Sequence, residues 1–188
     1  MPGTRMSEGP RLLKCETVYN GRRIALELRH VRGSDGREAV REIVRHRGSV
    51  AILAFPEPGK VLLERNWREA IGREMLEIPA GTLEPNEDPA ACASRELVEE
   101  TGYQTMCLEP ILTLHPSPGI MTEQMTVYLA SDLTAGEPSR DAGEEIVNVL
   151  VAIDEALAMI ADGRITDAKT VASLLYWNQW RRKAQNDQ

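Results

Sequence analysis

The segment from Gly81 to Tyr103 constrains the fold most strongly, because it marks both ends of one helix. Asp88 is a residue type that caps helix N-termini, and Pro89 suits the first helical position. Gly102 stands where a left-handed C-terminal cap is required. We therefore predict a helix from Pro89 to about residue 101, with a loop before it.

Three glutamates of this predicted helix lie on one face. Glu96, Glu99 and Glu100 are spaced i, i+3 and i+4, which places neighbouring Cβ atoms about 5–6 Å apart. Like charges at this spacing repel one another and disfavour the helix. A divalent cation would convert this repulsion into coordination. Hard oxygen ligands favour Mg²⁺, with Mn²⁺ as the alternative, over zinc.

Neighbouring residues suit the same purpose. Glu87 precedes the helix cap and can fold back over the first turn, and Arg95 can hold a carboxylate in one rotamer. Gly81 allows the backbone to approach a ligand closely, and the Ala80 carbonyl is then a further candidate metal ligand. Glu87, Glu96, Glu100 and Ala80 are our candidate metal ligands.

A bare Glu-x-x-Glu-Glu on an exposed helix usually indicates a solvated surface. The spacing of the residues around it therefore decides whether these glutamates mark a metal site. The full set is Gly81, Glu87, Arg95-Glu96-Leu97, Glu99-Glu100, Gly102 and Tyr103. Every one of these positions matches the signature of the Nudix hydrolases, which the chain resembles. The resemblance implies a metal-dependent hydrolase of nucleoside diphosphates linked to another moiety. It makes Glu96 and Glu100 the principal ligands, and Glu87 and Glu99 auxiliary ligands or orienting groups.

The flanking sequence resembles the ADP-ribose pyrophosphatase branch of that family. Leu63–Arg68 and Leu76–Gly81 resemble its approach to the signature, and Pro118 follows Tyr103 by 15 residues, as in that branch. Thr166–Thr170 is also similar. Asn66-Trp67 replaces the commoner Gln and Tyr, whereas the Arg position is retained at Arg68.

The resemblance implies roles for residues outside the signature. Arg68, and Arg41 with Glu42, are candidates for contacts with the diphosphate or terminal ribose, although a surface salt bridge is an equal alternative for Arg41. Trp67 is a candidate for stacking on adenine, with plain packing as the alternative. Glu77 and Pro118 complete the predicted substrate site.

The catalytic base of the family is usually a carboxylate on a loop outside the signature. Glu123, Glu144 and Glu145 are the candidates, and the sequence does not rank them. Glu99 and Arg95 complete the predicted catalytic set. Hydrogen-bond reach to the attacking water, which sequence does not show, decides among bases.

The resemblance predicts an α/β (α+β) Nudix fold, a mixed β-sheet sandwiched between helices with an N-terminal antiparallel β-strand lobe. We assign residues 1–47 to this lobe and 48–188 to the hydrolase domain. Within the lobe, Leu12–Tyr19 and Arg22–Val31 flank Asn20-Gly21, which favours a tight hairpin turn with positive φ. The lobe is too small to bury much alone, and the resemblance implies a homodimer with swapped N-terminal strands that contribute to dimerisation and substrate contacts.

Composition excludes several classes of function. The formal net charge of −7 argues against nucleic-acid binding, which requires a basic face. No apolar run is long enough to span a membrane, the N-terminus does not resemble a signal peptide, and three cysteines without metal-type spacing indicate a reducing cytoplasm.

The preferred hypothesis is Mg²⁺-dependent hydrolysis of ADP-ribose to AMP and ribose 5-phosphate. One alternative keeps the chemistry but changes the substrate to other nucleoside diphosphate sugars such as GDP-mannose, or to a dinucleoside polyphosphate. Another alternative is a module that binds ADP-ribose without catalysis, although such a module has no need of all these carboxylates.

Overall fold

The computed structural model describes residues 9–140, 143 and 145–181. The described chain divides into two units, one comprising residues up to Arg47 with Ser117–Glu123 and the other comprising Gly48–Pro116 with the residues from Gln124 onward.

The N-terminal unit is an antiparallel sheet of three strands in the order β1 (Arg11–Asn20), β2 (Ile24–Arg32) and β3 (Glu38–His46). All ten residues of β1 are exposed, so this edge strand covers no core. The predicted turn at Asn20-Gly21 is wrong. Asn20 ends β1, the connection runs through residues 21–23, and neither Asn20 nor Gly21 has a positive φ. The Gly21 N–H donates to the Ile24 carbonyl at 2.9 Å and closes this longer connection.

The second unit contains two further sheets. β7 (Ala80–Thr82), β4 (Ser49–Ala54), β9 (Met125–Ser131) and β8 (Cys107–Leu114) form a mixed sheet in which only the pairing of β4 with β9 is parallel. β10 (Ile146–Ala152), β5 (Lys60–Arg68) and β6 (Arg73–Glu77) form an antiparallel sheet. The helical segments are α1 (Pro89–Glu96), η1 (Leu97–Thr101), α2 (Ile153–Ala161), α3 (Ala168–Tyr176) and η2 (Trp177–Arg181).

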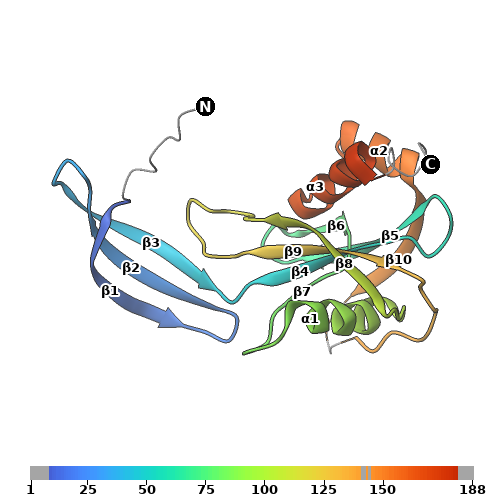
Figure 1. Cartoon of the computed structure of the whole chain (residues 1–188), viewed down its shortest axis with the longest axis horizontal. Helices are drawn as coiled ribbons and strands as arrows, with labels where there is room; N and C mark the ends of the chain where they lie inside the picture. Colours follow the sequence, from blue (N-terminus) through green and yellow to red (C-terminus); the bar gives the residue numbers. More distant parts are fainter. Residues whose placement is uncertain (1–8, 141–142, 144, 182–188) are drawn as a thin grey trace. The chain divides into compact units, whose positions relative to one another are not determined.

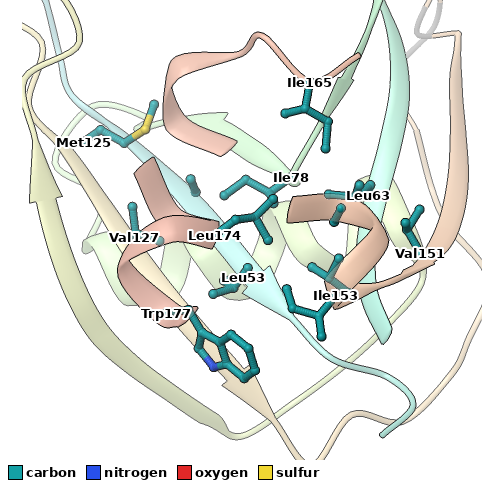
Figure 2. Packing of buried hydrophobic residues seen from close by; sticks show 13 residues of the cluster. Leu53, Leu63, Ile78, Met125, Val127, Val151, Ile153, Ile165, Leu174 and Trp177 are labelled. Carbon is teal, nitrogen blue, oxygen red and sulfur yellow. The ribbon is translucent and has the colours of Figure 1, made fainter. Parts of the chain in front are cut away.

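Helices cover both faces of the mixed sheet, which explains why every residue of β4 is buried. Ala51 and Leu53 belong to the cluster that includes Leu174 and Trp177 of the last helical segments, on the face shown in Figure 2. Val50 and Ile52 belong to a second cluster with α1. Figure 1 shows α2 and α3 on one side of β4 and β9, and α1 on the other. This is the mixed sheet between helices that the resemblance to the Nudix hydrolases implied.

The helix that follows β7 begins at Pro89 and ends before Gly102 as predicted, but its last turn is not α-helical. The Asp88 carboxylate accepts the N–H groups of Ala90 and Ala91 at 2.9 and 3.2 Å, and Gly102 ends the helix with a left-handed φ of 80°. Its last turn, Leu97–Thr101, is a π-helix and not a continuation of the α-helix. Single π turns inside helices are frequent at functional sites, and this one carries Glu99 and Glu100.

Candidate active site

Two glutamates of the helix reach the start of β7. Glu100 Oε2 accepts the backbone N–H of Ala80 at 3.0 Å, and the side chain is only 6% exposed. A Cβ added to Gly81 would lie 1.9 Å from the Glu96 carboxyl carbon, so a larger residue at Gly81 would displace this carboxylate. The close approach predicted at Gly81 therefore accommodates Glu96, and the Ala80 carbonyl belongs to the same corner.

Arg95 holds the other carboxylates. Its Nε and Nη2 donate to the two oxygens of Glu87 at 2.9 and 3.0 Å, while Nη1 donates to Glu96 at 2.8 Å and to Glu99 at 2.9 Å. The loop fixes Glu87 further, since the Glu84 N–H donates to Glu87 Oε2 at 2.8 Å. The sequence indicates one carboxylate partner for Arg95, whereas the structure gives it three.

These contacts perturb the ionisable groups. The hydrogen bonds from Arg95 lower the pKa of Glu87 to about 2, and the same bonds raise the pKa of Arg95. Burial raises the pKa of the Cys92 thiol to about 12. Glu87 is therefore an anion at neutral pH, whereas Cys92 is an inert thiol.

The donor set suits a hard divalent cation. Within residues 9–140, 143 and 145–181, no three His, Cys, Asp or Glu side chains are arranged to hold a metal ion. The signature glutamates have other partners here: Arg95 pairs with Glu87, Glu96 and Glu99, and the Ala80 N–H donates to Glu100. All the candidate metal-ligating atoms are oxygens, which Mg²⁺ and Mn²⁺ prefer. Glu96 and Glu100 both approach the corner that carries the Ala80 carbonyl, so the residues fit such an ion.

A second charged cluster lies on the strands before the helix. Arg68 of β5 binds Glu77 of β6 through two parallel bonds of 2.9 and 2.6 Å. Lys169 of α3 pairs with the same Glu77 and lies 3.0 Å from the Asp167 carboxylate. Burial alone would raise the pKa of Glu77, but the Arg68 hydrogen bonds and the Lys169 charge outweigh it, and this pKa is lowered.

The remaining predicted site residues are distributed over both units. Trp67, 47% exposed, neighbours Arg68 on β5, and Glu145 is exposed just before β10. Glu144 lies outside the described residues. Arg41, Glu42, Pro118 and Glu123 belong to the N-terminal unit.

The sequence does not indicate the groups that hold the end of the π-helix. The Ser139 N–H donates to the Glu99 carbonyl at 3.0 Å, and Arg140 Nε donates to the Glu100 carbonyl at 3.0 Å. Asn148 of β10 donates to the Thr101 carbonyl at 3.2 Å. The buried pair of Lys169 with Glu77 was not predicted either. A lysine inside an amphipathic helix was the sequence feature that could have indicated it. No local pattern marks Arg140 or Asn148.

Comparison with known proteins identifies the family of the chain. The NUDIX domain family model matches residues 45–174, and the chain belongs to the Nudix family. It is a Nudix hydrolase, a class of enzyme that generally uses divalent metal ions. None of its helices, among the residues described, is long and apolar enough to cross a membrane.

Individual relatives cover most of the chain. An ADP-ribose pyrophosphatase of Bacillus subtilis strain 168 is 38% identical over 86% of this chain and 88% of its own length. A methanol dehydrogenase activator of Bacillus methanolicus is 37% identical over 87% of this chain and 90% of its own length. Other relatives are named GDP-mannose pyrophosphatase. The crystal structure of an ADP compounds hydrolase shares the fold, with a TM-score of 0.83 at 23% identity over 96% of this chain and 98% of that one.

Proposed function

We propose that this protein is an Mg²⁺-dependent ADP-ribose diphosphatase that produces AMP and ribose 5-phosphate, with Mn²⁺ able to replace Mg²⁺. The observation that carries the proposal is the approach of Glu96 and Glu100 to the Ala80–Gly81 corner, beside the carboxylates that Arg95 holds. Similarity to the B. subtilis ADP-ribose pyrophosphatase supports the choice of substrate.

The protein's own residues have distinct tasks in this mechanism. Glu96, Glu100, Glu87 and the Ala80 carbonyl would hold the metal, which when bound neutralises the diphosphate and acidifies water. Arg95 keeps Glu87, Glu96 and Glu99 in fixed rotamers. A carboxylate accepts a proton from the attacking water, whose oxygen bonds to phosphorus as the bond from phosphorus to the bridging oxygen breaks. Glu99, Glu123, Glu144 and Glu145 are the candidate bases.

Substrate contacts are assigned to residues around the second cluster and in the N-terminal unit. Glu77 holds Arg68 in an extended fork, and the Arg68 side chain remains 42% exposed and available to a diphosphate. The exposed ring of Trp67 suits stacking on adenine. Arg41, Glu42 and Pro118 remain candidates for contacts with the rest of the substrate.

We assign residues 1–47 to dimerisation and substrate contacts, and residues 48–188 to the hydrolase domain. The fully exposed β1, with Leu12, Val18 and Tyr19 among its exposed apolar residues, supports a homodimer in which N-terminal strands are exchanged. The three free thiols, all in the described part of the chain, suit a reducing cytoplasm.

A substrate panel in ¹⁸O-water tests the activity. We expect ADP-ribose to be cleaved faster than GDP-mannose, one ¹⁸O atom to enter one of the two phosphate products, and excess EDTA to abolish turnover. Faster cleavage of GDP-mannose would establish the alternative substrate suggested by the other relatives. Binding of ADP-ribose without turnover would make the protein a binding module instead.

A further inference from the structure

Two buried oxygens without hydrogen-bond partners lie on paired residues of β5 and β10. Glu64 is 2% exposed, and neither its Oε1 nor Asn148 Oδ1 has a partner among the described residues. The strand register pairs Asn148 directly with Glu64, which places their side chains on the same face with Cβ atoms about 4.5–5.5 Å apart. An ionised carboxylate and an amide oxygen both only accept hydrogen bonds, so neither can satisfy the other.

A proton on Glu64 resolves this conflict. A carboxyl O–H can donate to Asn148 Oδ1, which then satisfies both orphan oxygens with one hydrogen bond. The orientation of the Asn148 amide is set independently, because its Nδ2 donates to the Thr101 carbonyl. Oδ1 is therefore the atom left for Glu64.

The charges around Glu64 come from four elements. Arg68 lies on its own strand, Glu77 on β6, Lys169 on α3 and Arg140 on the segment before β10. Burial raises the pKa of Glu64 and the Glu77 carboxylate adds to the rise, while the three cations oppose it, and the net result is a pKa raised to about 8. The protonated form is thus compatible with neutral pH.

We propose that Glu64 is a positioning residue that is protonated in the folded enzyme and donates its proton to Asn148 Oδ1. Asn148 then holds the Thr101 carbonyl and, with it, the end of the π-helix that carries Glu99 and Glu100. The positioning part rests on the proposed role of Glu100 in metal binding. The protonation part is independent of that role.

Infrared difference spectroscopy tests the protonation directly. At pH 7 the wild type minus Glu64→Gln spectrum is expected to show the C=O stretch of a protonated carboxyl group, and the band is expected to disappear above pH 8. Ser173→Ala is the matched control, because it removes another buried oxygen without a partner and should leave the band intact. A wild type without this band at pH 7 would overturn the proposal.

Thermal unfolding provides a second readout without substrate. Because the pKa of Glu64 is raised, the folded protein keeps a proton that the unfolded chain loses above about pH 4.5. The Tm of the wild type should therefore fall, relative to that of Glu64→Gln, between about pH 4.5 and pH 8, and the difference should stay constant above pH 8. Parallel Tm curves for the two proteins across this interval would contradict a protonated Glu64.

Kinetics test the positioning role. Glu64→Leu removes the donor and should lower kcat by about 10- to 100-fold with little change in KM, as for other residues that orient metal ligands. Glu64→Gln restores an N–H donor and should recover most of this loss. Equal kcat values for Glu64→Leu and the wild type would refute the positioning role. If Glu64→Leu does not fold, a large loss of kcat in Glu64→Gln would refute the positioning role instead. If even the wild type is inactive, the infrared test and the thermal test still decide whether Glu64 is protonated.

Discussion

The backbone N–H of Ala80 donates to Glu100 Oε2 at 3.0 Å and joins the start of β7 to the π-helix. This bond holds one carboxylate of the signature at the strand end, whereas Arg95 holds three others. The acidic cluster is therefore organised by a backbone amide on one side and a guanidinium on the other.

Glu100→Gln tests the assignment of a metal ligand. The amide oxygen of glutamine can still accept the Ala80 N–H, so the fold should persist, but the loss of a charged ligand should lower kcat by at least about 100-fold. Steady-state rates with ADP-ribose and circular dichroism measure the two effects. Glu155→Gln, an exposed change on α2, is the control. Activity within a few-fold of the wild type would contradict the assignment.

Arg95→Met tests how repulsion among the carboxylates is relieved. Without the guanidinium, Glu87, Glu96 and Glu99 lose their shared cation, so Tm in EDTA should fall and the rise in Tm on adding Mg²⁺ should exceed that of the wild type. Scanning fluorimetry measures both values. Arg65→Met removes the same charge from a half-exposed residue whose nearest carboxylate oxygen is 4.0 Å away. An equal response to Mg²⁺ in the Arg95 and Arg65 variants would argue against this role.

Glu87 should govern part of the acid denaturation. Its pKa is lowered to about 2 in the folded protein, so it contributes stability above the ordinary pKa of about 4.5 and loses that contribution as pH falls from there toward 2. Glu87→Gln should therefore show a flatter decline of Tm over this interval. Measurements of Tm at half-unit pH steps test this role of Glu87. Identical slopes of Tm against pH for the wild type and Glu87→Gln would contradict it.

Glu77→Gln should destabilise the protein strongly. The buried carboxylate pairs with both Arg68 and Lys169, and removal of one member of a buried charge cluster costs about 3–5 kcal/mol. Urea denaturation gives the free energy of unfolding. Glu74→Gln on the same strand affects an exposed carboxylate and should change that value by less than about 0.5 kcal/mol. Similar values for both variants would refute the importance of the buried cluster.

If the exposed face of β1 lies in a dimer interface, charged substitutions on it should dissociate the dimer. Leu12→Lys with Val18→Lys places charges on apolar side chains that are 53% and 47% exposed, so a dimer that covers them should dissociate. Light scattering over a range of protein concentrations measures the mass. Met106→Lys changes a fully exposed apolar residue of the other unit and should leave the mass unchanged. A monomeric wild type would rule out the proposed exchange of strands.

Much of the local structure follows from the sequence. Asp88, Pro89 and Gly102 determine where the helix begins and ends, because caps act through bonds to residues a few positions away. The full set of spaced positions from Gly81 to Tyr103, and not the three helix glutamates alone, marks the family. The same local reasoning failed at Asn20-Gly21, where the hairpin takes a longer connection, and it did not anticipate the π turn.

Only the tertiary structure decided which distant groups meet. Lys169 reaches Glu77 across 92 residues, Glu100 binds the Ala80 backbone, and β10 brings Asn148 opposite Glu64. Local propensity carries no information about such pairs, since they depend on strand register and on which face of the sheet each helix covers. The sequence by itself determined the residues available for chemistry, whereas the packing of β5, β6, β7 and β10 against the helices decided how their charges are held.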